Sequence, residues 1–177
     1  MNEAFDAPFI WTKSQIESPA YLKLREAVMS DLGGVLVFSC PCLAGKSWAL
    51  KDLIYRLREN GCKAIYINAK KASGSSSFCE FFYSKLGCPT KAASYDLASL
   101  LPASEGPEPG YIIVVIDHLE DVLRFPDTRD VIVGLARESY EESTSPFRVL
   151  VCVGPETEAQ QVLSWNGKQK IRYGNGL

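Results

Sequence analysis

The sequence predicts an α/β fold in which a parallel sheet lies between layers of helices. Short apolar runs such as Val35–Phe38 lack the alternation of a half-solvated strand, and continuous runs of this kind suit strands buried on both faces. Between these runs lie segments whose apolar residues recur every three or four positions, which is the spacing of amphipathic helices. Strands that alternate with helices favour a parallel sheet. The length of 177 residues suits one domain of this class.

Helix start and stop signals bound the elements in the first half of the chain. Ser18 is a cap and Pro19 a first-turn residue for a helix that ends before Gly33. Asn60 and Gly61 close a second helix, because glycine readily takes the left-handed conformation that follows a helix end. In order, we expect a strand at Val35–Phe38, a helix at Lys46–Asn60, a strand at Lys63–Asn68, a loop at Ala69–Ser77 and a helix at Phe78–Leu86.

The second half contains the strongest strand signal, the apolar run Tyr111–Ile116. The segment before it, Pro102–Gly110, is too rich in proline and glycine to form a helix or a strand, so it predicts a loop. The remaining expected elements are helices at Ser94–Leu101, Leu119–Arg124, Thr128–Tyr140 and Glu156–Ser164, and strands at Arg148–Val153 and Lys170–Tyr173.

Composition and charge limit the function classes. Lys and Arg number 19 and Asp and Glu 21, and this net charge of −2 gives no electrostatic argument for nucleic acid or an anionic membrane as a partner. The apolar runs are too short to span a bilayer, and acidic residues precede the first of them, unlike a signal peptide. Six cysteines without a C-x-x-C pair and a single histidine favour free thiols over a zinc site. We therefore expect an intracellular protein, cytoplasmic or nuclear.

A phosphate-binding loop is predicted between the first strand and the following helix. The segment SCPCLAGKS is a near match to G-x-x-x-x-G-K-[ST], with Cys40 in the position of the first glycine. Backbone N–H groups in such a turn point into a concavity that suits phosphate, although a chance G-K-S on a loop is the alternative. Lys46 would contact the β- and γ-phosphates, and the Ser47 hydroxyl would bind Mg²⁺. The predicted nucleotide-binding residues are Cys40, Pro41, Cys42, Leu43, Ala44, Gly45, Lys46, Ser47 and Trp48.

An acidic residue directly follows the apolar strand Tyr111–Ile116. Asp117 in this place is typical of a Walker B motif, in which the carboxylate holds Mg²⁺ directly or through water. The alternative is a strand that merely ends at the N-cap of a helix, where aspartate is common. The phosphate-binding loop earlier in the chain favours the metal-binding interpretation.

With these two motifs the chain resembles the P-loop NTPases, specifically the branch of AAA+, origin-recognition-like and signal-transducing (STAND) ATPases. The resemblance covers most of residues 33–156 and is carried by GGVLVFSCPCLAGKS, WALKDLIYRLRENG, KAIYIN, YIIVVIDHLED and RVLVCVGPE. It implies a three-layer α/β/α sandwich with a mainly parallel five-stranded sheet of order 5-1-4-3-2, the P-loop after the first strand and Asp117 after the third.

The chain departs from this family at the catalytic positions. Members usually follow the Walker B aspartate with a second acid that polarises the attacking water, and His118 takes that place here. A neutral imidazole can accept a proton from water, but the substitution equally fits a lost catalytic group. Glu120 and Asp121 lie close by as further candidates, and Gly154 stands where members carry a polar sensor residue. The candidate arginine fingers are Arg124, Arg129 and Arg137.

The sequence therefore predicts an ATP-binding domain with weak Mg²⁺-dependent hydrolysis that acts as a nucleotide-dependent switch. The predicted catalytic residues are Lys46, Asp117 and His118, and the predicted metal ligands are Ser47 and Asp117. ATP is favoured over GTP because the guanine-reading pattern Asn-Lys-x-Asp is absent from the sequence. The alternative is a catalytically degenerate pseudo-ATPase that serves as a protein-interaction scaffold, which Cys40 and His118 favour.

Two further expectations concern organisation and partners. Residues 1–30 are expected to form an N-terminal segment and helix that pack on the core, and residues 31–177 to form the P-loop core without a C-terminal lid. Besides the nucleotide, a protein partner or self-association is expected, with no membrane.

Overall fold

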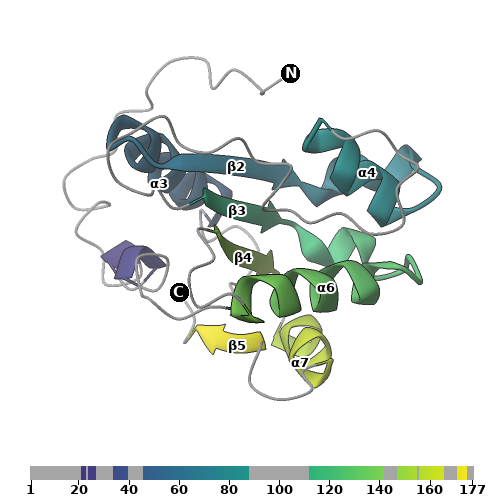
Figure 1. The fold of residues 1–177 in the computed structure, drawn as a ribbon. Helices are drawn as coiled ribbons and strands as arrows, with labels where there is room; N and C mark the ends of the chain where they lie inside the picture. Colours follow the sequence, from purple (N-terminus) through teal and green to yellow (C-terminus); the bar gives the residue numbers. More distant parts are fainter. Residues whose placement is uncertain are drawn as a thin grey trace.

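Five parallel strands form one sheet in the computed structural model, which describes residues 21–22, 24–26, 34–39, 46–87, 112–141, 147–154, 156–165 and 171–174. The order is β2-β3-β4-β1-β5, which reads 5-1-4-3-2 from the opposite edge, and each neighbouring pair is parallel (Figure 1). The α/β class with a parallel sheet is thus confirmed. The strands are β1 (Val35–Ser39), β2 (Lys63–Asn68), β3 (Ile112–Asp117), β4 (Phe147–Val153) and β5 (Ile171–Gly174).

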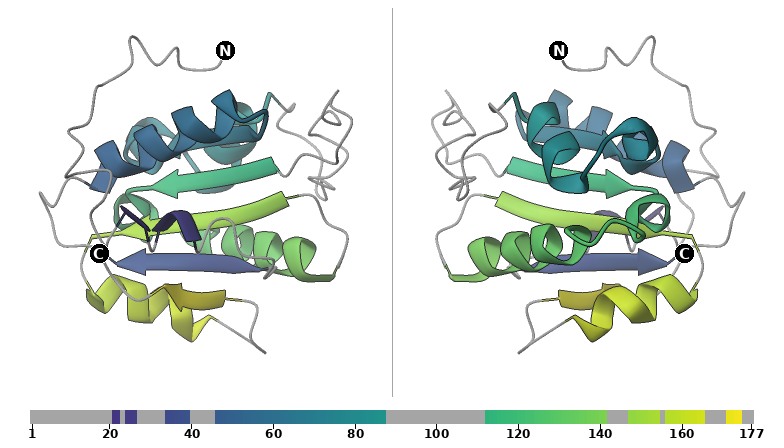
Figure 2. Two further views of the ribbon diagram at one scale, coloured as in Figure 1. Left: turned by 90° about the vertical axis from the view of Figure 1, so that its left-hand side faces the viewer. Right: turned by 90° about the vertical axis from the view of Figure 1, so that its right-hand side faces the viewer.

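Helices cover both faces of this sheet, as the two views of Figure 2 show. On one face lies α3 (Lys46–Glu59), whose apolar side contributes Leu50, Leu53 and Ile54 to a buried cluster. The other face is covered by α4 (Phe78–Lys85), α6 (Thr128–Glu141) and α7 (Glu156–Ser164), whose apolar residues form a second cluster. Among the described helices, none is long and apolar enough to cross a membrane.

The interior position of β3, between β2 and β4, explains why its sequence is apolar without a break. Alternate residues of a strand point to opposite faces, so Val114 packs toward α6 while Val115 packs toward α3. All six residues from Ile112 to Asp117 are buried. Both faces of a parallel sheet covered by helices therefore require the continuous apolar run that the sequence shows.

The end of α3 confirms the predicted role of Gly61. The N–H of Cys62 donates to the carbonyl of Leu57 at 2.9 Å, and the N–H of Gly61 donates to the carbonyl of Arg58 at 3.0 Å. This pair of bonds is a Schellman motif, which requires a left-handed residue between them, and Gly61 has φ +81°. The turn sends the chain directly into β2.

Two short segments differ from the expectation. The predicted loop at Ala69–Ser77 contains a 3₁₀ helix, η1 (Ala69–Gly74), and the predicted helix at Leu119–Arg124 is a 3₁₀ helix, η2 (Leu119–Val122). In η1 the residues Ala69 and Ala72 are buried, and their spacing of three matches the three-residue turn of a 3₁₀ helix. The sequence predicted a loop here because lysine, serine and glycine, which make up the rest of this stretch, are also typical of loops.

Several expected features lie outside the described residues. These are the start of the first helix at Ser18 and Pro19, the helix at Ser94–Leu101 and the loop at Pro102–Gly110. Residues 21–22 and 24–26 are helical, and Tyr21 and Leu24 are buried in the cluster under α3. Burial raises the pKa of Tyr21 to about 12, and the negative charge of Asp52 adds to this effect. The division of the chain at residue 30 stays a prediction.

Asp127, in the turn before α6, fixes the start of α4. Its Oδ2 accepts the N–H of Cys79 at 2.7 Å and its Oδ1 accepts that of Phe78 at 3.3 Å. The first amides of a helix have no partner within the helix, so this carboxylate satisfies them. We expect Asp127→Ala to lower the free energy of unfolding by about 1–3 kcal/mol in urea denaturation. Asp130→Ala, at an exposed position in the first turn of α6, is the control and should cost at most about 0.5 kcal/mol. Equal effects of the two variants would contradict the assigned role.

Candidate functional site

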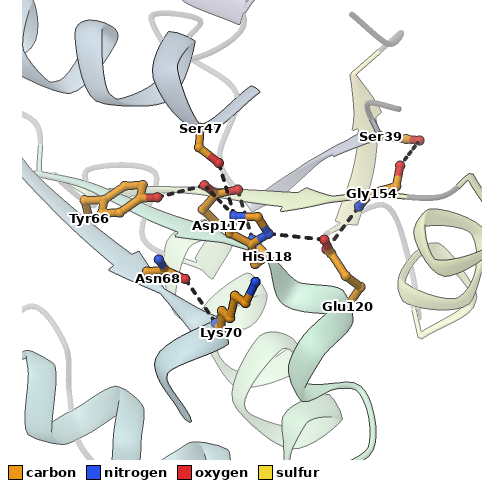
Figure 3. Close-up of polar contacts among 9 residues, drawn as sticks. All are labelled: Ser39, Ser47, Tyr66, Asn68, Lys70, Asp117, His118, Glu120 and Gly154. Atoms are coloured by element: carbon orange, nitrogen blue, oxygen red, sulfur yellow. Dashed lines mark hydrogen bonds and ion pairs between the residues drawn. The ribbon is translucent and has the colours of Figure 1, made fainter. Parts of the chain in front are cut away.

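The candidate site lies at the edge where the parallel strands end. Asp117 is the last residue of β3, and Asn68, the last residue of β2, is its register partner. Ser47 stands in the first turn of α3, and Gly154 directly follows β4. In open α/β sheets, ligands bind in the crevice outside the carboxyl ends of the strands. Figure 3 shows the side chains that meet at this edge.

Asp117 is the most deeply buried acid of the site, with 0% of its surface exposed. The Tyr66 hydroxyl donates a hydrogen bond to Oδ2 at 2.7 Å, and the backbone N–H of His118 donates to Oδ1 at 2.9 Å. Both donors are uncharged groups. A buried carboxylate is costly unless a positive charge or a metal accompanies it, so this environment suits a cation ligand.

His118 connects the two predicted metal ligands. Its Nε2 atom lies 3.2 Å from the Ser47 hydroxyl oxygen and 3.7 Å from Asp117 Oδ2. On the other side of the ring, Nδ1 lies 3.4 Å from Glu120 Oε1. In a neutral imidazole one nitrogen donates and the other accepts, and a carboxylate oxygen lies near each nitrogen here, Glu120 Oε1 near Nδ1 and Asp117 Oδ2 near Nε2. When the hydrogen is on Nδ1, Nε2 is an acceptor that faces the Ser47 hydroxyl.

The backbone conformation of His118 sets this orientation. The residue has φ 59° and ψ 43°, in the left-handed region that non-glycine residues adopt with difficulty. Strain of this kind persists only where the surroundings enforce it, and it concentrates at functional sites. The turn lets the chain leave β3 and enter η2 while the imidazole stays beside Ser47.

Glu120 links His118 to the end of β4. Its Oε2 accepts the N–H of Gly154 at 3.0 Å, while its Oε1 faces the imidazole. The Ser39 hydroxyl at the end of β1 donates to the carbonyl of Gly154 at 3.5 Å. Glu120 is therefore placed to orient His118. At the position after β4, where the resembling family carries a polar side chain, this chain has a glycine whose backbone amide binds Glu120.

The predicted phosphate-binding residues are only partly described. Cys40, Pro41, Cys42, Leu43, Ala44 and Gly45 lie outside the described residues, and of Lys46 only the backbone, as the first residue of α3, is described. Trp48 is 51% exposed, with the Lys51 ammonium 5.5 Å from its ring centroid. The roles of these residues in nucleotide binding stay predictions.

The three candidate arginine fingers are all described by the structure and are exposed. The guanidinium of Arg124 donates to the Ser73 carbonyl at 3.5 Å and stands 5.1 Å from the Phe125 ring centroid. Arg129 and Arg137 are exposed on α6. Their finger role stays a prediction.

The residues present fit a magnesium ion by their chemistry. Mg²⁺ takes oxygen ligands, and the site offers the Ser47 hydroxyl and the buried carboxylate of Asp117. Donor atoms of His118, Glu120 and Asp121 also lie within 4.8 Å of one another. Acidic groups commonly gather at surfaces without a metal, and Glu120 already pairs with Gly154, so we assign no ion to this second group.

Tyr66 is a site residue that sequence reasoning missed. Its hydroxyl reaches Asp117 because β2 and β3 are parallel neighbours, and this neighbour relation cannot be read from the strand KAIYIN alone. A polar ring atom near the end of an apolar strand was the available signal. The hydrogen bond fixes one oxygen of the buried carboxylate.

We expect Tyr66→Phe to lower the free energy of unfolding by about 1–2 kcal/mol, because a buried carboxylate loses a donor. Urea denaturation measures this difference. Tyr55→Phe is a matched control, since the Tyr55 hydroxyl donates to Glu59 at 2.8 Å on the exposed side of α3. The control should change the free energy by less than about 0.5 kcal/mol. A Tyr66 variant as stable as the Tyr55 variant would show that the bond to Asp117 contributes nothing.

No family model matches the sequence, and no curated protein matches it. Solved structures are similar. Orc1 of Aeropyrum pernix, in complex with DNA, is 14% identical with a TM-score of 0.59 over 94% of this chain and 46% of that chain. Cdc6p of Pyrobaculum aerophilum is 16% identical, with a TM-score of 0.54 over 94% of this chain and 46% of that chain. AMPPCP-bound DnaA of Aquifex aeolicus is 10% identical with a TM-score of 0.53 over 93% and 48%.

This chain therefore has the fold of the AAA+ P-loop ATPases. At these identities the likeness concerns the fold alone, and the chain spans less than half the length of these three proteins. The net charge gave no argument for nucleic acid as a partner, and the comparisons give no support to a case against it, since the Orc1 structure and a Drosophila ORC structure contain DNA.

Proposed function

We propose that this chain binds ATP with Mg²⁺ at the carboxyl edge of its sheet and hydrolyses it weakly, as a nucleotide-dependent switch. The backbone amides of residues 40–47 and the Lys46 ammonium would hold the phosphates. Ser47 and Asp117 would hold the metal, which when bound would neutralise charge on the phosphates. A protein partner or self-association would respond to the bound nucleotide.

The observation that carries this proposal is the convergence of Ser47 and Asp117 on one atom. Their oxygens lie 3.2 Å and 3.7 Å from Nε2 of His118, although the two residues come from different elements. The Asp117 carboxylate is buried and receives hydrogen bonds from uncharged donors, an environment that a divalent cation would stabilise. The fold shared with nucleotide-binding ATPases supports the same assignment.

The proposed hydrolysis depends on His118. Nε2 must exchange the Ser47 hydroxyl for a water molecule, which the ring then orients and from which it accepts a proton. Glu120 contacts the ring at Nδ1, on the edge opposite Ser47, and stabilises the charge that the imidazole gains. We expect slow turnover because the accepting nitrogen is engaged by Ser47 before the metal binds.

A specific contact also favours the alternative, a pseudo-ATPase scaffold. The hydrogen bond between Ser47 and His118 occupies the hydroxyl that a metal would need. Asp117 is likewise engaged by Tyr66. If these contacts persist with nucleotide present, the chain keeps the fold without turnover and acts through its surface.

Thermal melts with and without Mg-ATP, followed by a phosphate-release assay, test the proposal. We expect Mg-ATP to raise the melting temperature, because a ligand that binds only the folded state stabilises it. We also expect slow phosphate release that EDTA abolishes. Stabilisation without release would favour the scaffold. An unchanged melting temperature at millimolar Mg-ATP would overturn nucleotide binding.

A further inference from the structure

Lys70 stands at the edge of the candidate site, two residues beyond the end of β2. Asn68, the register partner of Asp117, caps η1, and its side-chain oxygen accepts the N–H of Lys70 at 3.1 Å. The 3₁₀ helices η1 and η2 pack against each other, and Arg124, just after η2, donates to the Ser73 carbonyl in η1. The backbone of Lys70 is thus held beside the segment that carries His118.

The side chain of Lys70 extends toward Asp117, His118 and Glu120 in Figure 3. The residue is exposed, and its ammonium makes no hydrogen bond or ion pair within the part of the chain that the structure describes. The two carboxylate oxygens of Glu120 face His118 and Gly154, and neither of these contacts is with Lys70.

Two other described cations near the ends of these strands, Lys51 and Arg124, have different surroundings. The ammonium of Lys51 lies 5.5 Å from the ring centroid of Trp48 and 5.8 Å from that of Tyr66. Arg124 lies over Phe125. Lys70 therefore offers a positive charge to a ligand at a site whose own charged groups include Asp117 and Glu120.

We propose that Lys70 binds the terminal phosphate of a nucleoside triphosphate and so makes the site prefer triphosphate over diphosphate, an inference that rests on the proposed function. The γ-phosphate would lie beyond Ser47, on the side of Asp117 and His118. Lysine suits this contact because its ammonium is a compact charge with three donors on a flexible stem. A γ-phosphate near the two carboxylates needs a positive charge to offset their repulsion. A diphosphate lacks this phosphate and therefore does not reach the Lys70 ammonium.

Binding constants for Mg-AMPPNP and Mg-ADP, measured by calorimetry, test the proposal without turnover. We expect Lys70→Ala to weaken Mg-AMPPNP binding about ten-fold, the loss of one charge-assisted contact, with Mg-ADP unchanged within two-fold. Lys70→Arg keeps the charge and should retain most of the preference. Lys63→Ala is the matched control. It removes the same charge from the start of β2, at the amino end of the strand and away from the site.

The outcomes separate this inference from the proposed function. A wild-type chain that binds neither nucleotide overturns both. A wild-type chain that binds them, with a preference that Lys70→Ala leaves unchanged or with equal losses for both nucleotides, overturns the role of Lys70 alone. Lys70→Gln, which keeps a polar side chain only one atom shorter and removes the charge, serves the same test should the alanine variant fold poorly.

Discussion

Lys46→Ala should remove most of the stabilisation that Mg-ATP gives the folded chain. Lys46 is the first residue of α3, and at this amino-terminal end of the helix the free backbone N–H groups and the helix dipole attract anions. The lost contact between ammonium and phosphate corresponds to a weakening of about 100-fold, or nearly 3 kcal/mol. At a ligand concentration of 100 times the wild-type dissociation constant, stabilisation should fall from about 2.7 to about 0.4 kcal/mol.

Denaturant unfolding with and without Mg-ATP measures this effect. Lys51→Ala is the control, because Lys51 lies on the same helix, five residues further along, with its ammonium over the Trp48 ring. It should keep most of the stabilisation. If the Lys46 variant is stabilised as strongly as the control, the segment SCPCLAGKS does not bind phosphate as proposed.

His118→Glu is expected to raise the rate of phosphate release at least about ten-fold, because a positioned general base typically contributes a factor of about 100 or more to a rate. The substitution restores the second acid that the resembling family carries. It also removes the ring that engages the Ser47 hydroxyl, so the proposed metal ligand becomes available. The left-handed backbone at this position opposes the change, because glutamate adopts it less readily than histidine, at a cost of up to about 1 kcal/mol in stability.

His118→Asn is the matched control for this experiment. Asparagine tolerates the left-handed conformation but offers no basic nitrogen, so it separates the chemistry of the side chain from the strain of the backbone. Steady-state phosphate release should fall with asparagine and rise with glutamate. A fall with both variants would mean that the imidazole is the working group and that a carboxylate cannot replace it.

Much of the fold could be predicted from local sequence signals. The bounds of β2 and α7 were predicted to the residue, because Asn60-Gly61 and Gly154-Pro155 interrupt the neighbouring elements. The prediction missed η1 because its lysine, serine and glycine residues are also typical of loops. At η2 it did not distinguish a 3₁₀ helix from an α-helix, since the two kinds of turn share nearly the same short apolar spacing. The identity of Asp117 as the polar end of a buried strand was also visible in the sequence.

The sequence by itself determined which segments are buried strands, which are amphipathic helices, and which polar residues end them. Periodicity and capping are local, so neighbouring residues carry that information. Only the tertiary structure decided that Tyr66 binds Asp117, that Ser47 meets His118 and that Glu120 turns toward Gly154. These contacts depend on strand order, register and the left-handed turn at His118, which arise when distant segments pack against one another.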